Sequence, residues 1–317
     1  MTRFADRVDD RRLTPIIAYL CAPLRIAVRG RAGTGRAMVA AALEGTGVTI
    51  TGRDHADVTV VVVAEALKPE DRAMLAGPGG PVLTVLNKAD LSGTRDGGPL
   101  ETARRRAAHF RALTGVPTVP MSALLARATL DDELTCALRT LVTEAADFTS
   151  ADAFTTTPHQ IPPAVRARLL ATLDRFGIAH AVLALSRGAD ATALPAVLRE
   201  ISGVDRVRAE IDVAAAPVRY RRVREAITRL QAVAAMSDDA RIAEFLVADG
   251  TVLALTGAAT EVVRAAGVVV DDHDESRDHL RRALYWRRYS QGPVNGLHRD
   301  CGADIARGAL KLLGRSR

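Results

Sequence analysis

Two short motifs hold the residues that could do chemistry in this chain. The first is the segment GRAGTGRA, residues 30–37, in which Gly30 and Gly35 have the spacing of a phosphate-binding loop, with Gly33 between them. In such a loop, backbone NH groups and a helix N-terminus surround a phosphate chain. We therefore predict phosphate contact here. A plain turn between a strand and a helix is the alternative, because short glycine patterns have many false positives.

Two positions of this loop depart from the usual pattern. Arg36 stands where the motif has lysine, and Ala37 stands where a hydroxyl would bind Mg²⁺. Arginine can pair with phosphate, but it is bulkier than lysine and places its charge differently. We expect Arg36 to contact phosphate, and we expect Mg²⁺ to have lost one of its ligands.

The second motif is NKAD, residues 87–90, which directly follows the apolar segment VLTVL. The carboxylate of Asp90 can accept hydrogen bonds from the two NH donors on the edge of guanine, a pattern that adenine does not present. Asn87 and the aliphatic stem of Lys88 are expected to hold the loop and the base. The motif predicts guanine recognition, with a polar turn that caps a buried strand as the alternative.

A third element, Ser122 and Ala123, follows the segment VPTVPM, where a backbone NH could contact the oxygen of the base. A serine that begins a turn or caps a helix would explain it equally well. In this order, the three elements resemble the translation-factor-type GTPases, where they are the phosphate-binding loop, the NKxD motif and the SA(K) motif. The resemblance covers residues 24 to about 146. It implies a P-loop G-domain that binds GTP or GDP.

The chain lacks other parts that this resemblance would require. Only residues 44–57 lie between the first predicted helix and the next long strand, too few for two switch segments, and DxxG is absent. Asp54 and Asp57 precede a strand where the family's magnesium aspartate follows one, so neither takes that role. Phosphoryl transfer depends on Mg²⁺, a lysine and an oriented water. We predict a pseudo-GTPase; a slow GTPase completed by a partner is the alternative.

The predicted elements around these motifs alternate between strands and helices. Strands are expected at 24–28, 48–51, 58–63, 82–86 and 116–121, and helices at 15–24, 38–43, 69–77, 100–114 and 131–146. Such alternation favours an α/β fold with a parallel sheet that is covered on both faces. We place the first domain at residues 1–150, as an N-terminal helix followed by the degenerate G-domain.

The second half has a different pattern. The polar segment 149–163 is predicted to be a linker, and residues 151–317 are predicted to be mainly α-helical, with 181–185 either a strand or a helical turn. These helical segments look like those that follow the G-domains of bacterial dynamin-like proteins, in a pattern carried by Leu198, Ser202, Gly203, Val204 and Val207. That resemblance implies a stalk, a dynamin-like GTPase as partner, and peripheral membrane association through the partner.

One segment of the second half combines arginines with aromatic residues. It contains Arg281, Arg282, Arg287 and Arg288 together with Tyr285, Trp286 and Tyr289. It could bind a protein or nucleic acid, but we favour a helix whose aromatic side chains face the core. His298, Cys301 and Asp304 could suggest metal ligands, and cap and core roles are favoured for them as well.

Composition limits the classes of function that fit. The 317 residues are 48% hydrophobic and 25% charged, as in a globular protein of about two domains. The net charge of +6 is modest, which makes nucleic-acid binding an unfavoured interpretation. No uninterrupted apolar run reaches the length of a membrane span, so we expect a cytoplasmic protein. Cys21, Cys136 and Cys301 lie far apart and fit reduced thiols.

Overall fold

The chain forms two compact units. The computed structural model describes residues 10–45, 47–77, 80–93, 97–236, 240–271 and 276–315. Residues Arg25–Ile211 form the first unit, here called the sheet unit, and Met1–Leu24 with Asp212–Arg317 form the second, here called the helical unit. This division differs from the predicted one at residue 150. The reason is that the helices between residue 150 and residue 211 bury their apolar side chains within the sheet unit, and only those after residue 211 belong to the helical unit.

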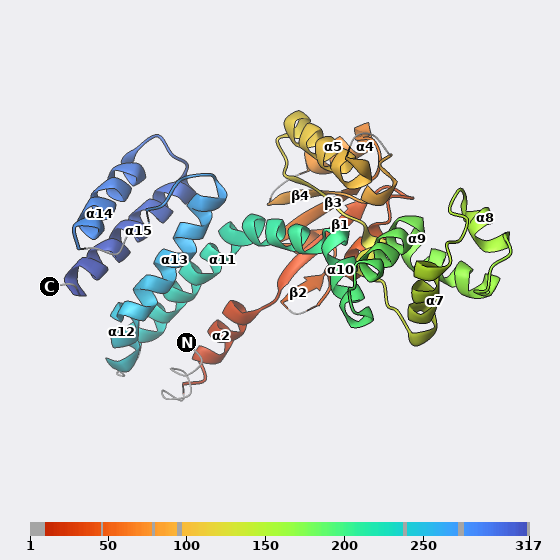
Figure 1. Ribbon diagram of the computed structural model, residues 1–317. Coiled ribbons are helices and arrows are strands. Elements are labelled where there is room, and N and C mark those ends of the chain that lie inside the picture. Colours follow the sequence, from red (N-terminus) through yellow and green to blue (C-terminus); the bar gives the residue numbers. More distant parts are fainter. Residues whose placement is uncertain are drawn as a thin grey trace. The chain divides into compact units, whose positions relative to one another are not determined.

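The sheet unit is built on five strands (Figure 1). They are β1 (Leu24–Gly30), β2 (Val48–Ile50), β3 (Val58–Val63), β4 (Val82–Leu86) and β5 (Thr118–Pro120), in the order β2-β1-β3-β4-β5. The pairs β1–β3, β3–β4 and β4–β5 are parallel. The valines Val60 to Val63 are fully buried, as expected for a parallel strand covered on both faces. The predicted α/β fold with a parallel sheet is confirmed.

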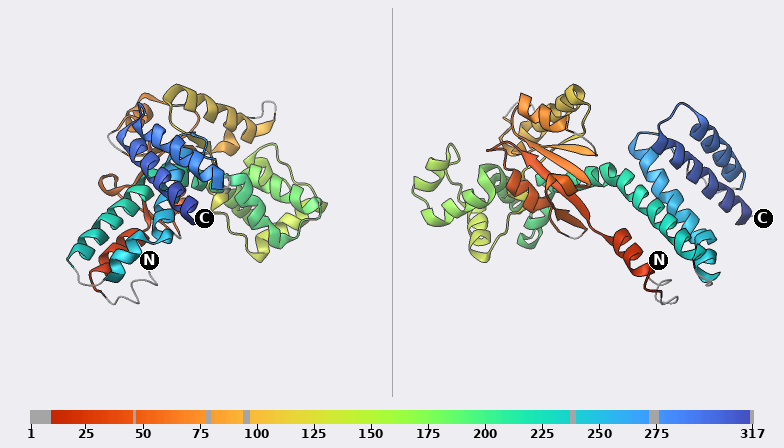
Figure 2. Two further views of the ribbon diagram at one scale, coloured as in Figure 1. Left: turned by 90° about the vertical axis from the view of Figure 1, so that its left-hand side faces the viewer. Right: turned by 180° about the vertical axis from the view of Figure 1, so that it is seen from behind.

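Helices cover the sheet and bring the motifs to one edge. α3 (Arg36–Leu43) follows β1, while α4 (Pro69–Leu75) and α5 (Gly98–Thr114) lie together on one face (Figures 1 and 2). The short 3₁₀ turns η1 (Arg53–His55) and η2 (Ala89–Leu91) precede β3 and follow β4. Gly30 pairs with Val62, and Leu86 pairs with both Val63 and Pro120. The carboxyl ends of four strands therefore meet at one edge, where ligands of open parallel sheets bind.

Residues 123–203 form a helical module with a core of its own. The module contains α6 (Ala123–Ala126), α7 (Asp132–Thr143), α8 (Ala151–Thr156), α9 (Pro163–Ser186), η3 (Ala191–Ala193) and α10 (Leu194–Ser202). Its buried side chains include Leu138, Phe154, Leu169 and Leu198. The predicted linker at 149–163 is therefore wrong, since α8 and the buried Phe154 and Ile161 lie inside it. Residues 181–185 are helical.

The two ends of the helical module meet at the sheet. The amide of Ser122 donates to the carbonyl of Ser202 over 2.8 Å. Gly203 has φ +76°, and a Cβ there would lie 2.7 Å from the carbonyl oxygen of Pro120. The module is thus an insertion between β5 and the helix that completes the sheet unit. This close return also explains why Gly203 is glycine.

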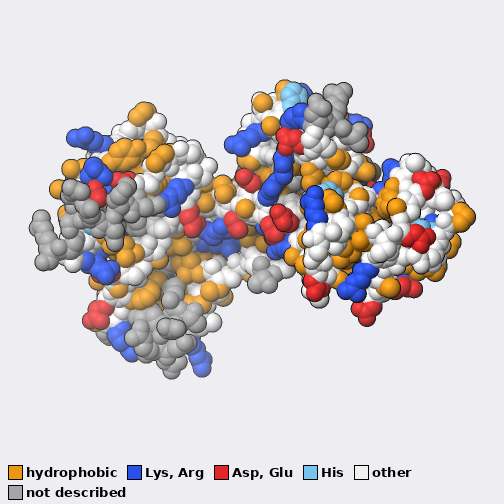
Figure 3. Space-filling view, viewed as in Figure 1, with side chains coloured by type: hydrophobic (Ala, Val, Ile, Leu, Met, Phe, Trp, Pro, Cys, Tyr) orange, Lys and Arg blue, Asp and Glu red, His pale blue; other side chains and the backbone are white. Residues whose placement is uncertain are grey.

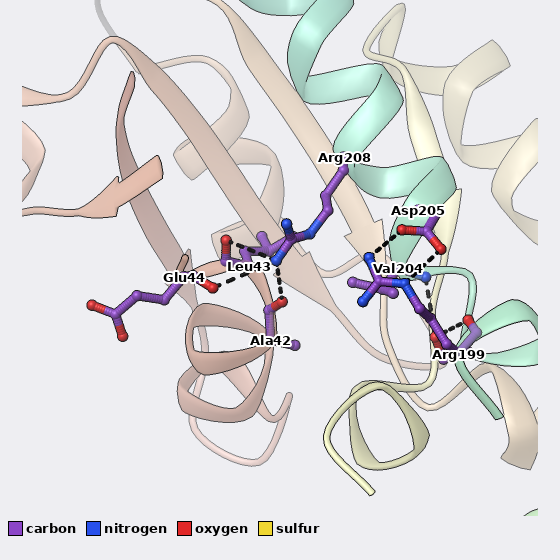
Figure 4. A network of polar contacts seen from close by, with 8 residues as sticks. Ala42, Leu43, Glu44, Arg199, Val204, Asp205 and Arg208 are labelled. Atoms are coloured by element: carbon purple, nitrogen blue, oxygen red, sulfur yellow. Dashed lines mark hydrogen bonds and ion pairs between the residues drawn. The ribbon is translucent and has the colours of Figure 1, made fainter. Parts of the chain in front are cut away.

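The helix that follows the insertion is α11 (Val204–Ala235). Its first turns belong to the sheet unit, where Nη2 of Arg208 donates to the carbonyls of Ala42 and Leu43 over 3.1 and 3.4 Å (Figure 4). Arg199 and Asp205 form an ion pair across the α10–α11 turn in the same view. Arg208 therefore satisfies carbonyls at the C-terminus of α3, which an isolated helix end leaves without partners.

The helical unit contains the N-terminal helix and the C-terminal part of the chain. Its elements are α2 (Leu13–Cys21), the rest of α11, α12 (Ala240–Val247), α13 (Asp249–Ala265), α14 (Ser276–Gln291) and α15 (Gly296–Arg315). One core surrounds Tyr220 and Trp286, and another packs Leu13 and Ile16 of α2 against Leu230. The predicted helical character of residues 151–317 is confirmed for the part that the structure describes.

Within the described residues, one helix, α9, has the length and hydropathy of a membrane span, and α12 and α13 reach that limit only as a pair bent by 46°. α9 places Leu169, Leu173 and Ile178 in the core of the helical module. It also carries Arg166 and Arg168. Length and composition alone are weak evidence for a span, because core helices of soluble proteins pass the same test.

Candidate functional site

One buried side chain joins the three predicted motifs. Asn87, only 4% exposed, follows β4 directly. Its Nδ2 donates to the carbonyl of Thr34 over 2.9 Å, and its Oδ1 accepts from the amide of Ala123 over 3.0 Å. The glycine-rich loop, the NKAD segment and the Ser122–Ala123 segment therefore form one site at the edge of the sheet.

The glycine-rich loop is shaped by positions that favour glycine. Gly33 and Gly35 have φ values of +81° and +79°, where other residues are strained. A Cβ at Gly35 would also lie 2.5 Å from Nδ2 of Asn87, so the contact between the two motifs depends on this glycine. Gly35 accepts the first backbone hydrogen bonds of α3, from Met38 and Val39. The N-terminus of α3, with its partial positive charge, is thus at the loop.

The two arginines of the loop differ in their partners. Nε of Arg31 donates to Oδ1 of the fully buried Asp71 over 2.9 Å, and Oδ2 of Asp71 accepts from the amide of Lys68. The hydrogen bond that Arg31 donates to Asp71 raises the pKa of Arg31. Arg36 is exposed, and within the described parts of the chain its guanidinium makes one polar contact, to the carbonyl of Gly30 at 3.4 Å.

It follows that Arg36, and not Arg31, has a charge that no carboxylate among the described residues neutralises. Sequence reasoning missed the pair between Arg31 and Asp71. The pattern of Pro69 at the first helical position and Asp71 two residues later does indicate a helix start, but nothing in it indicates Arg31 as a partner.

The NKAD segment presents one carboxylate without a partner. Lys88 has a left-handed backbone, with φ +60°, and an exposed side chain. The amide of Ala89 donates to the carbonyl of Met121 over 3.1 Å, which ties η2 to the end of β5. Asp90 is partly exposed, and within the described parts of the chain its carboxylate makes no hydrogen bond or ion pair. It is available to accept the NH donors of a ligand.

The amides of Ser122 and Ala123 already have acceptors. Ser122 donates to Ser202, and Ala123 donates to Asn87. A base oxygen at this position would have to replace one of these acceptors. The hydroxyl of Ser122 is buried and has no hydrogen-bond partner among the described residues. Sequence reasoning identified the segment and missed Ser202, which lies 80 positions further along the chain.

A small cavity of about 90 Å³ lies beside the NKAD segment. Its lining includes Ala89, Leu100, Arg104, Pro120 and Ser202. Enclosed pockets for drug-sized ligands start at roughly 300 Å³. A nucleotide would therefore lie along the open edge of the sheet and not inside this cavity.

The residues present do not fit a Mg²⁺ site of the usual kind. Ala37 has no hydroxyl, and the hydroxyl of Thr34 donates to the carbonyl of Arg31 over 2.9 Å. Asp57 accepts hydrogen bonds from the backbone and the guanidinium of Arg25. Among the described residues, no group of three or more His, Cys, Asp or Glu side chains could hold a metal ion.

Two aromatic residues of the basic aromatic segment, Trp286 and Tyr289, pack in the core of the helical unit. Trp286 is 1% exposed, and the hydroxyl of Tyr289 lies 2.6 Å from Nδ1 of His298. Cys301 is buried, and Asp304 accepts a hydrogen bond from the hydroxyl of Tyr220 over 2.7 Å. The core roles that we favoured are confirmed for Trp286, Cys301 and Asp304. The expectation is wrong for Tyr285, which is 52% exposed.

The surface charge of the chain is mixed. On the face drawn in Figure 3, basic and acidic side chains are interspersed over both units. A nucleic-acid surface would be expected to gather basic side chains in one patch or stripe.

Comparison with known proteins gives no assignment. No protein-family model matches this chain, and no curated protein matches its sequence at a significant level.

Proposed function

We propose that this chain is a pseudo-GTPase, a guanine-nucleotide-binding protein that does not hydrolyse its ligand and acts through a protein partner. The observation that supports this most is the position of Asn87, which links the glycine-rich loop to Ala123 by two hydrogen bonds. A polar turn that only caps a strand would not require contacts to two other loops that are far apart in the sequence.

Guanine selectivity follows from Asp90. Its carboxylate has no partner among the described residues and can accept both NH donors of a guanine edge, whereas adenine offers a different pattern. The ligand proposed for the site is GTP or GDP. Gly30, Gly33 and Gly35 shape the loop that would hold the phosphates, with Arg36 next to it.

The loss of hydrolysis follows from the missing machinery. Between α3 and β3 the chain has room only for β2 and η1, and Asp57 is engaged by Arg25. Asp54 and Asp57 both precede β3, at the opposite edge of the sheet from the motifs, so neither is placed to hold Mg²⁺ or orient an attacking water, which phosphoryl transfer requires. The proposed partner is a catalytically competent dynamin-like GTPase, which contacts the sheet unit or the helical unit and brings the protein to a membrane.

Calorimetric titration with GDP, GTP and ATP tests the proposal. We expect guanine nucleotides to bind and ATP to bind at least about tenfold more weakly, since mispaired buried hydrogen bonds cost about 1–3 kcal/mol each. Asp90→Asn should remove this selectivity. Asp54→Asn, an exposed aspartate on η1 without a described partner, is the matched control. The absence of binding at millimolar nucleotide would overturn the proposal.

A second candidate is a slow GTPase. It is favoured by the positive charge of Arg36, which no carboxylate among the described residues neutralises and which could contact phosphate. Here a partner would supply the missing groups. Phosphate release from GTP under multiple turnover, measured alone and with a dynamin-like partner, separates the two. Turnover that is lost in Arg36→Ala would favour the second candidate over the first.

A further inference from the structure

We propose that the site takes a guanosine diphosphate without a metal ion, and that Arg36 supplies the positive charge that Mg²⁺ and lysine supply elsewhere. This inference rests on the proposed function, because it assigns the ligand of the same site. It is carried by the charges and hydroxyl groups around the glycine-rich loop.

The hydroxyl groups argue against a metal ion. Residue 37, where the first ligand would stand, is alanine, and the nearby Thr34 is only 2% exposed, with its hydroxyl turned to the carbonyl of Arg31 inside the loop. Mg²⁺ keeps near-octahedral coordination and is normally held by one or two protein oxygens together with the phosphates. Neither residue offers such an oxygen, so nucleotide binding is independent of metal.

Of the two arginines in the glycine-rich loop, only one has a positive charge that is free to bind phosphate. Arg31 is held by the buried Asp71 at 2.9 Å, and moving it to a ligand would leave a buried carboxylate without its cationic partner. Arg36 begins α3, next to Gly35, and among the described residues its one polar contact is a long one of 3.4 Å to the carbonyl of Gly30. Its planar guanidinium can bind two phosphate oxygens at once. Arg36 is therefore the cationic side chain that the loop offers to the ligand.

One guanidinium and one helix N-terminus favour a diphosphate over a triphosphate. In GTPases the metal ion bridges the β- and γ-phosphates and neutralises their charge. Without a metal, the γ-phosphate brings additional negative charge, and within the described glycine-rich loop Arg36 is the one cationic side chain that is not already paired with a carboxylate. Since like charges within about 4–6 Å oppose each other strongly, GDP binds more tightly than GTP.

Titrations with GDP and GTP in EDTA and in excess Mg²⁺ test this assignment. We expect the affinity for GDP to be the same in EDTA and in Mg²⁺. In EDTA, we expect GTP to bind at least about tenfold more weakly than GDP. Arg36→Ala should weaken GDP binding by about tenfold or more, whereas Arg72→Ala, an exposed arginine of α4, should not change it. Thermal unfolding of each variant shows whether the fold is kept.

Restoring the usual chemistry gives a second test. The double variant R36K/A37T places lysine and a hydroxyl at the start of α3, so GDP and GTP binding should become stronger in Mg²⁺ than in EDTA. If wild-type GDP binding requires Mg²⁺, or if Arg36→Ala binds like Arg72→Ala, the metal-free assignment is overturned while the proposed function stands. If no guanine nucleotide binds in any condition, both are overturned.

Discussion

Asn87 shows how a single side chain can organise this site. It is almost fully buried, yet it satisfies one donor and one acceptor of two loops that lie 53 and 36 residues away in the sequence. Because buried polar groups are costly when unpaired, the loops and the asparagine depend on each other. The motif NKAD thus holds the neighbouring loops in place and is also a candidate recognition element.

Replacement of Asn87 by alanine should lower stability by about 2 kcal/mol or more, because the carbonyl of Thr34 and the amide of Ala123 lose their partner. Asn87→Asp should also destabilise, since a carboxylate oxygen would then face the carbonyl of Thr34. Urea unfolding followed by circular dichroism measures both. Unchanged midpoints would show that the three loops are held together by other contacts.

The three cysteines should differ in reactivity. Burial raises the pKa of the Cys301 thiol to about 12, so at pH 8 it stays protonated, and the thiolate is the reactive form. Cys21 and Cys136 are exposed. We expect iodoacetamide to modify two cysteines in the folded protein and all three in denaturant, as read by mass spectrometry. Labelling of Cys301 at the rate of Cys136 under native conditions would contradict its burial.

At this scale the sequence identified the motif positions but not their partners. Asn87, Asp90, Ser122 and Ala123 are recognisable because their order and spacing form a pattern. The pair between Arg31 and Asp71 is not, because it joins residues 40 positions apart through the packing of α4 beside the loop. Spacing along a sequence does not encode such contacts.

At the scale of elements, α3 is held at both ends. Its N-terminus follows the glycine-rich loop, and its C-terminal carbonyls accept hydrogen bonds from Arg208 of α11 (Figure 4). A cation at a helix C-terminus also interacts favourably with the helix dipole. The loop is therefore connected through one short helix to the start of a helix of 32 residues.

Arg208→Gln should destabilise the protein by about 1–2 kcal/mol, because it removes hydrogen bonds from a charged group to the end of α3. Arg206→Gln, an exposed position on the same helix, is the control and should have little effect. Thermal unfolding compares the two. Equal unfolding temperatures for both variants would mean that α3 does not depend on this contact.

The strands and most helices of the chain were predictable from periodicity, but α8 was not. Residues 149–163 are rich in threonine and proline, which usually marks a linker. Only Phe154 and Ile161 give the segment its buried side, and two apolar residues are too few to show a helical period. Their burial depends on α7 and α9, which are contacts that local composition cannot reveal.

At the scale of the whole molecule, the division of the chain follows packing and not sequence order. The sheet unit is interrupted by the helical module, and α2 belongs to the same unit as the C-terminal helices. A boundary drawn where the composition changes, at residue 150, falls inside the module. Insertions of this kind are tolerated when both ends meet at one place, as Ser122 and Ser202 do.

Removal of the helical module should leave the sheet unit folded. In a variant with residues 124–201 replaced by a short Gly-Ser linker, the ends have to span only the gap that Ser122 and Ser202 already bridge, so loop closure costs little. We expect a cooperative thermal transition and a circular dichroism spectrum with reduced helical signal. Loss of cooperative unfolding would show that the core of the module also supports the sheet.

The insertion also determines the order in which this chain can fold on the ribosome. The last strand of the sheet ends at Pro120, but the helix that caps α3 begins at Val204, and Arg208 reaches back across 166 positions to Ala42. At about 5–20 residues per second, the intervening segment takes several seconds to emerge. During that interval the helical module can fold from its own contacts, while the C-terminal carbonyls of α3 are still without Arg208.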